Sequence, residues 1–256
     1  MKIATKKLTQ SGFSLIELMI AMALGSFIIG GLISVFIGST NSYKLQQAIS
    51  QIQDKGRYAI KKIREDVQRS GFGLDYDTIA VRQIMGGVNT CVADVNTPIL
   101  EVYWHKKSPD TDMRRCYFLN ASNQLILREI TGAANTVPVA ADTEFVVVND
   151  VHLLAFSFAV DLDDIEGIDI VPTKSAYLPR DEMIVGNGVT PATTATWKKV
   201  RAVRMHLIVA SDTDFVTDQA QTIAPPFGTT LTTFFAQDRR LYQRFSATLA
   251  LRNRKH

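Results

Sequence analysis

A single acidic side chain lies where ionisation is most costly. Glu17 is the only charged residue in the largely apolar run of 25 residues from Phe13 to Ile37. As a helix, this run would extend about 37 Å at 1.5 Å per residue, enough to cross a bilayer core of ~30 Å. A carboxylate inside such a span needs a partner that pairs with it or neutralises it. We therefore expect Glu17 to have a specific function.

Three simple interpretations account for this segment less well. A secretory signal peptide cleaved near Ala21-Met22-Ala23 is disfavoured, because an acid interrupts its apolar stretch and the run continues for 14 residues beyond Ala23. A plain membrane anchor would explain Ser14 and Glu17 as a helix capping box, but it leaves the preceding Gly12 unexplained. A buried core helix is disfavoured by the length of the run.

The segment resembles the leader and N-terminal helix of type IV pilins and of type II secretion pseudopilins. The preceding residues carry three lysines and no acid, and they end at Gly12. In this resemblance Gly12 is the last leader residue, Phe13 the first mature residue, and Glu17 the glutamate of the family. The resemblance implies that a prepilin peptidase cleaves between Gly12 and Phe13 and methylates the amino terminus of Phe13. It also implies that Glu17 faces the amino terminus of a neighbouring subunit during assembly.

Overall charge gives no general argument for nucleic-acid binding. The formal net charge of +3 equals the contribution of the three leader lysines, so the chain from Phe13 onward is neutral. One basic stretch remains near the end of the chain: Arg239, Arg240, Arg244, Arg252, Arg254 and Lys255. DNA binding by this stretch, as in some competence pilins, is a less favoured alternative because its arginines partly alternate along a predicted strand.

The chain has two cysteines, Cys91 and Cys116. If the domain lies outside the cytoplasm, an oxidising compartment favours a disulfide between them, and two free buried thiols are the alternative. Neither a CxxC nor an HxxxH pattern is present, so we expect no zinc site.

The helical pattern continues beyond the apolar run. Between residues 41 and 70 apolar residues recur at three- and four-residue steps, with Gly56 as an interruption. They are Leu45, Ile49, Ile52, Ile60, Ile63 and Val67. We expect Lys61 with Glu65, and Lys62 with Asp66, to form ion pairs on the polar side. Residues 70–73, Ser-Gly-Phe-Gly, predict the end of one helix of roughly 57 residues.

The remainder of the chain shows the two-residue periodicity of strands. Residues 116–120 and 124–130 predict a hairpin around the turn at 120–123, and residues 144–148 and 152–160 predict another pair. Further strands are predicted at 99–104, 203–209 and 244–252, with long loops at 161–198 and 211–238. The predicted fold class is α+β, with a long N-terminal helix packed on an antiparallel sheet, which is also the pilin fold.

This pattern predicts three parts: a leader at 1–12, a helix at 13–70 and a β-rich periplasmic domain at 74–256. Within the helix we expect residues 13–38 to form the transmembrane and assembly half, and residues 41–70 the amphipathic half.

No catalytic constellation is visible, and we expect neither an enzyme nor a bound cofactor. His105, His152, His206 and His256 are scattered and belong to no metalloprotease or triad motif. Residues 161–167 contain four acids and end in glycine, but the spacing does not complete an EF-hand. We interpret this segment as a solvated acidic loop, with calcium binding as the alternative.

Two further segments narrow the resemblance. The end of the helix, Arg64 to Gly73, and the closing stretches Arg240 to Phe245 and Leu251 to Asn253 resemble the PilW family of minor pilins. That family implies a low-abundance subunit that helps to initiate the pilus used in twitching motility, near the tip. It also implies a single-pass inner-membrane precursor that later reaches the pilus at the cell surface. The implied partners are other minor and major pilins, the prepilin peptidase and the inner-membrane assembly platform. The alternative is a minor pseudopilin of type II secretion.

Overall fold

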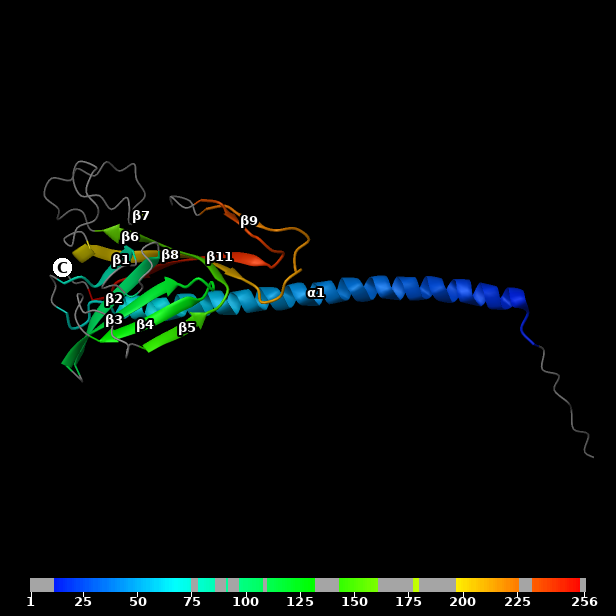
Figure 1. Ribbon diagram of the computed structural model, residues 1–256, viewed down its shortest axis with the longest axis horizontal. Coiled ribbons are helices and arrows are strands. Elements are labelled where there is room, and N and C mark those ends of the chain that lie inside the picture. Colours follow the sequence, from blue (N-terminus) through cyan, green and yellow to red (C-terminus); the bar gives the residue numbers. More distant parts are fainter. Residues whose placement is uncertain are drawn as a thin grey trace, which may run out of the picture. The chain divides into compact units, whose positions relative to one another are not determined.

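The computed structural model of the chain describes residues 12–74, 78–85, 91, 97–107, 110–131, 143–160, 177–179, 197–225 and 232–253. Its contacts divide the chain into two units, Met1–Gln46 and Gln47–His256, which we describe separately. One helix, α1 (Leu15–Arg69), has 55 residues and contributes to both units (Figure 1). The predicted long N-terminal helix is therefore confirmed.

The first unit contains the apolar half of α1. The most apolar 18-residue window of the helix has a mean hydropathy of 2.4, and none of it is buried within the chain. The hydroxyls of Ser26, Ser34, Thr40 and Ser42 each donate a hydrogen bond to the carbonyl four residues earlier. These polar side chains are thus satisfied inside the helix, as an apolar surrounding requires. By length and composition this segment can span a membrane.

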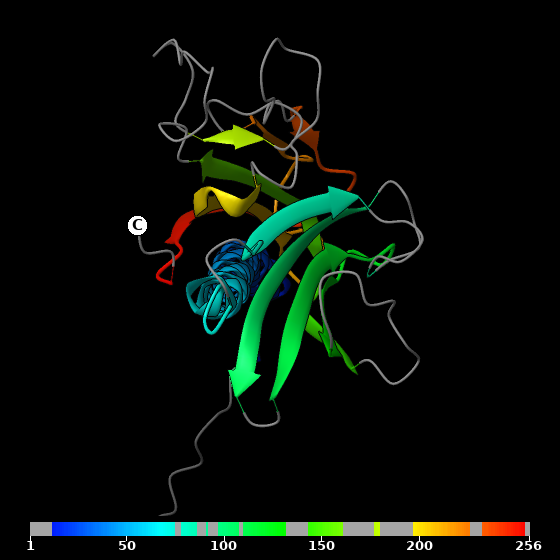
Figure 2. The ribbon, with the colours of Figure 1, turned by 90° about the vertical axis from the view of Figure 1, so that its left-hand side faces the viewer.

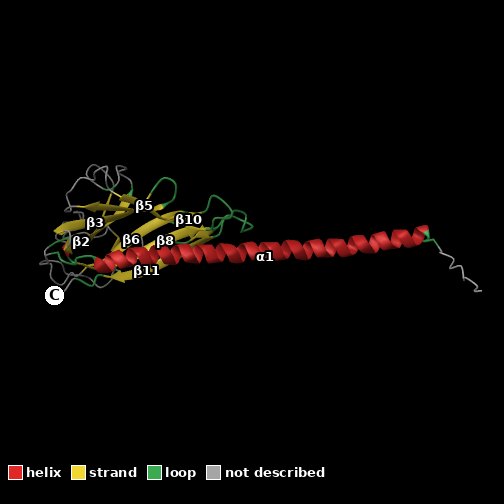
Figure 3. Cartoon of the chain, turned by 90° about the horizontal axis from the view of Figure 1, so that it is seen from below, coloured by secondary structure: helices red, strands yellow, loops and turns green. Residues whose placement is uncertain are grey.

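The second unit contains eleven strands among the residues that the structure describes, and all of their pairings are antiparallel (Figures 1 and 3). A five-stranded sheet has the order β1 (Val81–Met85), β2 (Pro98–Lys107), β3 (Asp110–Leu119), β4 (Leu125–Thr131), β5 (Thr143–Val148). A four-stranded sheet has the order β11 (Tyr242–Ala250), β8 (Val200–Ala210), β6 (Val151–Val160), β7 (Leu178–Pro179). A short hairpin pairs β9 (Thr222–Ile223) with β10 (Phe234–Phe235).

The second half of α1 provides the core against which both larger sheets pack (Figure 2). Its fully buried apolar residues, Ala48, Ile52, Ala59, Ile63 and Val67, form a stripe at three- and four-residue spacing. From the first sheet the same core includes Leu100, Val102, Tyr117 and Leu127, and from the second Phe158, Val203, Met205 and Leu207. One amphipathic helix thus buries the apolar faces of two sheets.

Gly56 lies on this stripe, and its missing side chain leaves room for a residue of a strand to contact the helix. A Cβ built on Gly56 would lie 2.5 Å from two ring carbons of Phe245 on β11. The sequence indicated that Gly56 interrupts the helical pattern, whereas α1 continues through it and uses the missing side chain to seat Phe245. The side chain of Phe245 is partly buried and packs against the core.

Two expectations about the strands differ from the structure, and one is confirmed. The predicted pair of strands at 144–148 and 152–160 is wrong: β5 pairs with β4, whereas β6 pairs with β8 and β7 in the other sheet. The chain changes sheets at Asn149 and Asp150, and Asp150 adopts a positive φ of 58° there. The 211–238 segment, expected to be a loop, contributes β9 and β10. The predicted hairpin of β3 and β4 is confirmed.

Two details of the predicted amphipathic helix are also corrected. Leu45 and Ile49, expected on the apolar stripe, keep 39% and 38% of their surface exposed. Lys61 does pair with Glu65, at 4.0 Å, but Asp66 is buried and pairs with Arg115 instead of Lys62. The position of Asp66, three residues after the buried Ile63, places it on the core side of the helix.

Gly56→Ala tests whether Phe245 requires this gap. Helix propensity alone favours alanine by about 1 kcal/mol, but overpacking against the ring costs ~1–3 kcal/mol. We expect a lower melting temperature for Gly56→Ala, measured on the full chain in detergent. In a Phe245→Ala background the same change should be neutral or stabilising. Equal losses in both backgrounds would show that the ring is not what opposes the methyl group.

His206 predicts a pH dependence of stability. This β8 residue is buried, its Nδ1 lies 2.8 Å from Ser246 Oγ, and its Nε2 has no hydrogen-bond partner among the described residues. Burial, together with the charges of Arg204 and Arg244, lowers the pKa of His206 to about 4. Since the unfolded residue titrates near 6.5, this contribution to stability is complete above that pH and is lost as the pH falls towards 4.

Between pH 7 and pH 4 we expect a loss on the order of 3 kcal/mol from this residue. Asp150 and Asp238 do not obscure this change, because their pKa values are lowered and they titrate below this pH range. Melting curves of the wild type and His206→Gln across this range provide the measurement. The variant should show a flatter pH dependence, and an unchanged slope would contradict the assignment.

Candidate functional sites

The three predicted processing and assembly residues, Gly12, Phe13 and Glu17, lie at the start of α1. Gly12 and Phe13 precede the helix, and Phe13 is 89% exposed. Ser14 Oγ accepts a hydrogen bond from the Glu17 backbone N–H at 3.2 Å, and Glu17 Oε2 accepts one from the Ser14 N–H at 3.4 Å. This reciprocal capping box satisfies two of the N–H groups that begin a helix. The non-helical Gly12–Phe13 bond is thus separated from a well-formed helix start.

The capping geometry gives Glu17 a local partner without removing its charge. Its carboxylate lies in the first turn, where a negative charge is favourable. The apolar residues that follow are exposed throughout, for example Phe27 at 86% and Val35 at 72%. A surface of this kind needs lipid or other apolar helices around it.

The other end of α1 is closed by residues from three parts of the chain. Gly71 and Gly73 have positive φ values of 75° and 70°, which favour glycine. The Gly71 N–H donates to the carbonyl of Tyr103 on β2 at 2.9 Å. The amide of Asn253 donates to the last helical carbonyls, those of Gln68, Arg69 and Ser70, at 3.2, 3.1 and 3.2 Å.

This arrangement joins two of the three segments on which the PilW resemblance was based. The 64–73 motif supplies the helix end and its glycine turn, and the 251–253 motif supplies Asn253. A side chain added at Gly71 would lie 3.3 Å from Ala80 Cβ and 3.7 Å from Asn253 Cβ. The turn is therefore closely packed as well as hydrogen-bonded.

A buried carboxylate fixes the same helix to the first sheet. Asp66 is 1% exposed; its Oδ1 lies 2.6 Å from Arg115 Nη1, and its Oδ2 accepts a hydrogen bond from the Tyr117 hydroxyl. Arg115 also contacts Glu129 at 2.6 Å. Burial, with the Asp66 charge nearby, raises the pKa of Tyr117, so the phenol remains a donor. A buried acid with two partners fixes the rotation of the helix, because a turned helix would leave it unpaired.

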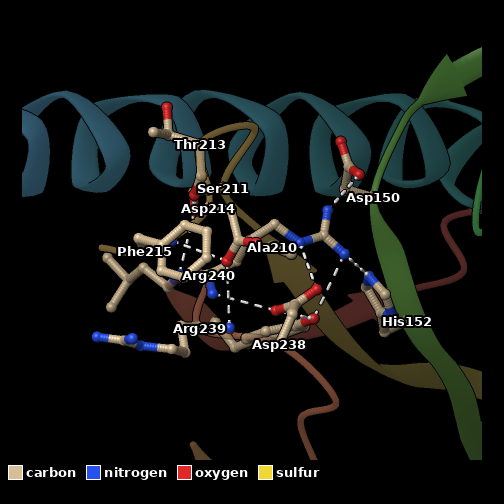
Figure 4. Close-up of polar contacts among 12 residues, drawn as sticks. Asp150, His152, Ala210, Ser211, Thr213, Asp214, Phe215, Asp238, Arg239 and Arg240 are labelled. Carbon is tan, nitrogen blue, oxygen red and sulfur yellow. Dashed lines mark hydrogen bonds and ion pairs between the residues drawn. The ribbon is translucent and has the colours of Figure 1, made fainter. Parts of the chain in front are cut away.

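A second charge network connects α1 to the junction of the two sheets. Figure 4 shows the part of it around Arg240, with Asp150, Asp238 and His152. Asp150, the residue where the chain changes sheets, contacts Lys55 Nζ at 2.9 Å and Arg240 Nη1 at 2.7 Å. Burial opposes ionisation of Asp150, but these two cations outweigh it and lower its pKa. Arg240 also contacts Asp238 at 2.8 Å and His152 Nε2 at 3.1 Å.

His152 must accept this hydrogen bond from Arg240, since a guanidinium only donates. Burial and the Arg240 charge lower the pKa of His152, so the ring is neutral with its proton on Nδ1. Tyr242 donates to Asp238 at 2.9 Å, and burial with this hydrogen bond raises its pKa to about 12. Arg240, Asp238, His152 and Tyr242 are thus hydrogen-bonded or ion-paired with one another.

Cys91 and Cys116 are joined in the structure, with their Cα atoms 6.3 Å apart. Together with the buried Glu101 they form the only group of potential metal ligands among the described residues, but both sulfurs are already bonded to each other. Glu101 lies 2.5 Å from Arg82 Nε and 3.4 Å from Arg114 Nη1. Its charge is thus balanced by arginines, and this cluster stabilises the outer face of the first sheet.

The structure leaves some of the sequence predictions untested, because their residues are not described. The acidic segment at 161–167, His256, Arg254 and Lys255 lie outside the described residues. In the basic stretch, Arg240 is held by internal ion pairs and Tyr242 is 5% exposed, which leaves few groups to bind a phosphate backbone or to stack on bases. His105 contacts Asp112 at 2.9 Å.

Sequence reasoning missed the residues that hold the helix in place. Asp66 could have been found, because it shares a helical face with Ile63 and Ile52, and an acid on an apolar stripe indicates a buried partner. Lys55, Glu101 and Arg240 gave no comparable signal, because their partners are distant in sequence.

The helix α1 begins with a capping box and an apolar half, and its second half packs against two antiparallel sheets. These features together define a type IV pilin-like protein. The family model of the prokaryotic N-terminal methylation motif matches residues 7–33. The model described as type IV pilus-assembly protein W matches residues 116–253, more than half of the chain. The chain therefore belongs to the PilW family.

Among solved structures, a type IV-like pilin from Thermus thermophilus matches with a TM-score of 0.51 at 10% identity. The match covers 80% of this chain and 98% of that pilin. At this identity the similarity shows the fold alone, a pilin fold. No match was found among curated proteins.

Asn253→Ala tests the closure of the helix end. Removing the amide leaves the terminal carbonyls without this donor, and we expect a loss of about 1–2 kcal/mol in the free energy of unfolding. Asn253→Asp should cost more, because it replaces the donor with a negative charge beside the negative end of the helix dipole. Arg252→Ala, at the adjacent exposed position, is the matched control. Equal melting temperatures for all three variants would show that the amide contributes nothing.

Proposed function

We propose that this chain is a minor pilin that enters the inner membrane as a precursor and helps to initiate assembly of a type IV pilus. The observation that carries the proposal is the combination at the start of α1. A non-helical Gly12–Phe13 bond inside the matched methylation motif, a capped Glu17 and an exposed apolar helix follow one another along the chain. The PilW family match favours the pilus over type II secretion.

The physical mechanism is transfer of an apolar helix from lipid to protein. Burial of apolar surface is worth about 25 cal/mol per Å², so exposed side chains such as Phe27 and Phe36 favour a bundle of sister helices once the subunit leaves the membrane. Contacts between unlike surfaces repeat into an open filament. A minor subunit whose apolar helix is like that of other pilins can therefore join their bundle. Because its globular domain differs, the filament has a different surface where this subunit lies. In this proposal that position is near the tip.

In this proposal Glu17 sets the register between neighbouring helices in the bundle. Cleavage after Gly12 creates a positive amino terminus at Phe13, and a carboxylate in an apolar bundle is stable only beside such a charge. The Glu17 of one subunit and the amino terminus of its neighbour then pair at one defined offset. The globular domain, including the Cys91–Cys116 bond, is proposed to fold in the oxidising periplasm.

Intact-mass spectrometry of the protein from native membranes or sheared filaments tests the processing. We expect a chain that begins at Phe13, carries one added methyl group and is lighter than its fully reduced form by two hydrogen atoms. A chain that begins near Ala21–Leu24, or that retains Met1, would contradict the proposal. Cleavage without the mass difference on reduction would contradict the disulfide only.

Glu17→Gln separates the charge of this residue from its capping role. Glutamine can occupy the same position of a capping box, so the helix start is retained while the charge is lost. We expect Glu17→Gln and Glu17→Ala both to be cleaved, and both to be at least tenfold depleted in sheared filaments. Quantitative mass spectrometry of filaments and membranes measures this ratio. Normal incorporation of Glu17→Gln would show that the cap, and not the charge pair, is what assembly requires.

A further inference from the structure

The outer face of the second sheet brings two arginines and two hydroxyl groups together around a buried histidine. His206 of β8 lies directly opposite Ser246 of β11, and Arg204 of β8 lies opposite Thr248. Side chains two residues apart on a strand lie on the same face, so Arg244, two residues before Ser246, belongs to this group. The β8 residue between Arg204 and His206 belongs to the core, so the group lies on the outer face. We call these five residues the β8–β11 cluster.

Neither arginine of the cluster forms an ion pair with a residue that the structure describes. The guanidinium carbon of Arg204 lies 3.8 Å from the ring centroid of Tyr177, and its Nε lies 3.5 Å from Thr248 Oγ1. Arg244 donates a hydrogen bond from Nη1 to the carbonyl of Ala224 at 2.9 Å. The described strand residues that share this face on β6, β8 and β11 include no acid. Two positive charges therefore lie together without a counter-charge from these strands.

The lack of an acidic partner distinguishes Arg204 from other half-buried arginines of the globular unit. Four of these, Arg82, Arg115, Arg128 and Arg240, each pair with a carboxylate at 3.0 Å or less. A partly buried cation is costly without a partner, and a second cation nearby adds repulsion. An anion bound from outside the chain would remove this cost.

His206 orients the hydroxyl of Ser246 towards such an anion. The ring is 4% exposed, and burial with the charges of both arginines lowers its pKa, so it is neutral at pH 7. Its Nε2 has no described partner, and an orphaned buried N–H is rarer than an under-used acceptor, so the ring proton lies on Nδ1. Nδ1 then donates to Ser246 Oγ at 2.8 Å, which leaves the hydroxyl proton for an acceptor on the exposed side.

We propose that the β8–β11 cluster binds one phosphate group. The guanidinium groups of Arg204 and Arg244 neutralise it, and the hydroxyls of Ser246 and Thr248 donate to its oxygens. A phosphate monoester carries about 1.5–2 negative charges at neutral pH, which matches two unpaired cations better than a carboxylate with its single charge. Arg244, Ser246 and Thr248 are exposed, so the group reaches the site from solvent. Inorganic phosphate and a lipid with a phosphate monoester headgroup share this chemistry.

Equilibrium dialysis of the full chain in non-ionic detergent against inorganic phosphate tests the proposal. At an ionic strength held constant with chloride, we expect saturable binding of one phosphate per chain. About 10 mM phosphate should also raise the melting temperature by ~2–4 °C. Arg204→Gln and Arg244→Gln should each weaken binding about tenfold or more, because each removes a charge-assisted hydrogen bond. Arg252→Gln changes the net charge equally at another exposed arginine, and this matched control should bind phosphate like the wild type.

Three results would show a diffuse basic surface instead of a site. They are binding that does not saturate, equal competition by acetate or chloride at the same ionic strength, and equal weakening by Arg252→Gln. Because Arg244 is exposed, Arg244→Gln should keep the wild-type melting temperature in phosphate-free buffer. This variant decides the test if Arg204→Gln does not fold.

Mixed micelles identify the source of the phosphate group. If phosphatidic acid in the micelles displaces bound inorganic phosphate and phosphatidylcholine does not, the ligand is a lipid headgroup. If neither lipid displaces it, the ligand is free phosphate. None of these measurements depends on cleavage at Phe13 or on incorporation into filaments, so failure of the phosphate site leaves the proposed role in pilus assembly intact.

Discussion

The rest of the globular unit depends on the burial of one helical stripe between two sheets. Neither sheet could retain its apolar face without the helix, and Ile52, Ala59 and Ile63 of the helix are fully buried. Burial of apolar surface has no preferred direction, so it alone would tolerate rotation or sliding of the helix. Lys55 and Asp66 remove that freedom, because each needs specific partners on a different sheet or turn. Packing supplies the stabilisation, and the two ionic contacts select one register.

The two halves of α1 satisfy their polar groups in different ways. In the first half, hydroxyls such as Ser26 return their hydrogen bonds to the backbone of the same helix. In the second half, polar groups depend on segments far away in sequence, and the helix end depends on Asn253, almost at the end of the chain. The hydroxyls of the first half therefore need no partner from the globular unit. The second half is complete only when the last strand has been placed.

Local sequence patterns were enough to predict the helix, its end near residues 70–73 and the β3–β4 hairpin. They also predicted that the sheets are antiparallel. They failed where two strands close in sequence belong to different sheets, because only the left-handed Asp150 marks that change, and aspartate adopts this conformation without a distinctive pattern. The assignment of Gly12 and Phe13 to processing comes from a motif of fixed spacing and stays a prediction. The partners of Lys55, Asp66 and Glu101 could not be predicted, since their pairing arises from the tertiary fold.

The buried charges of the globular unit are held in pairs. Arg115 and Arg240 lie beside acids, and Glu101 is surrounded by arginines, so these charges contribute to the fold. A buried charge is tolerated only beside such partners. The positions of these pairs therefore restrict how the helix and the strands can pack against one another.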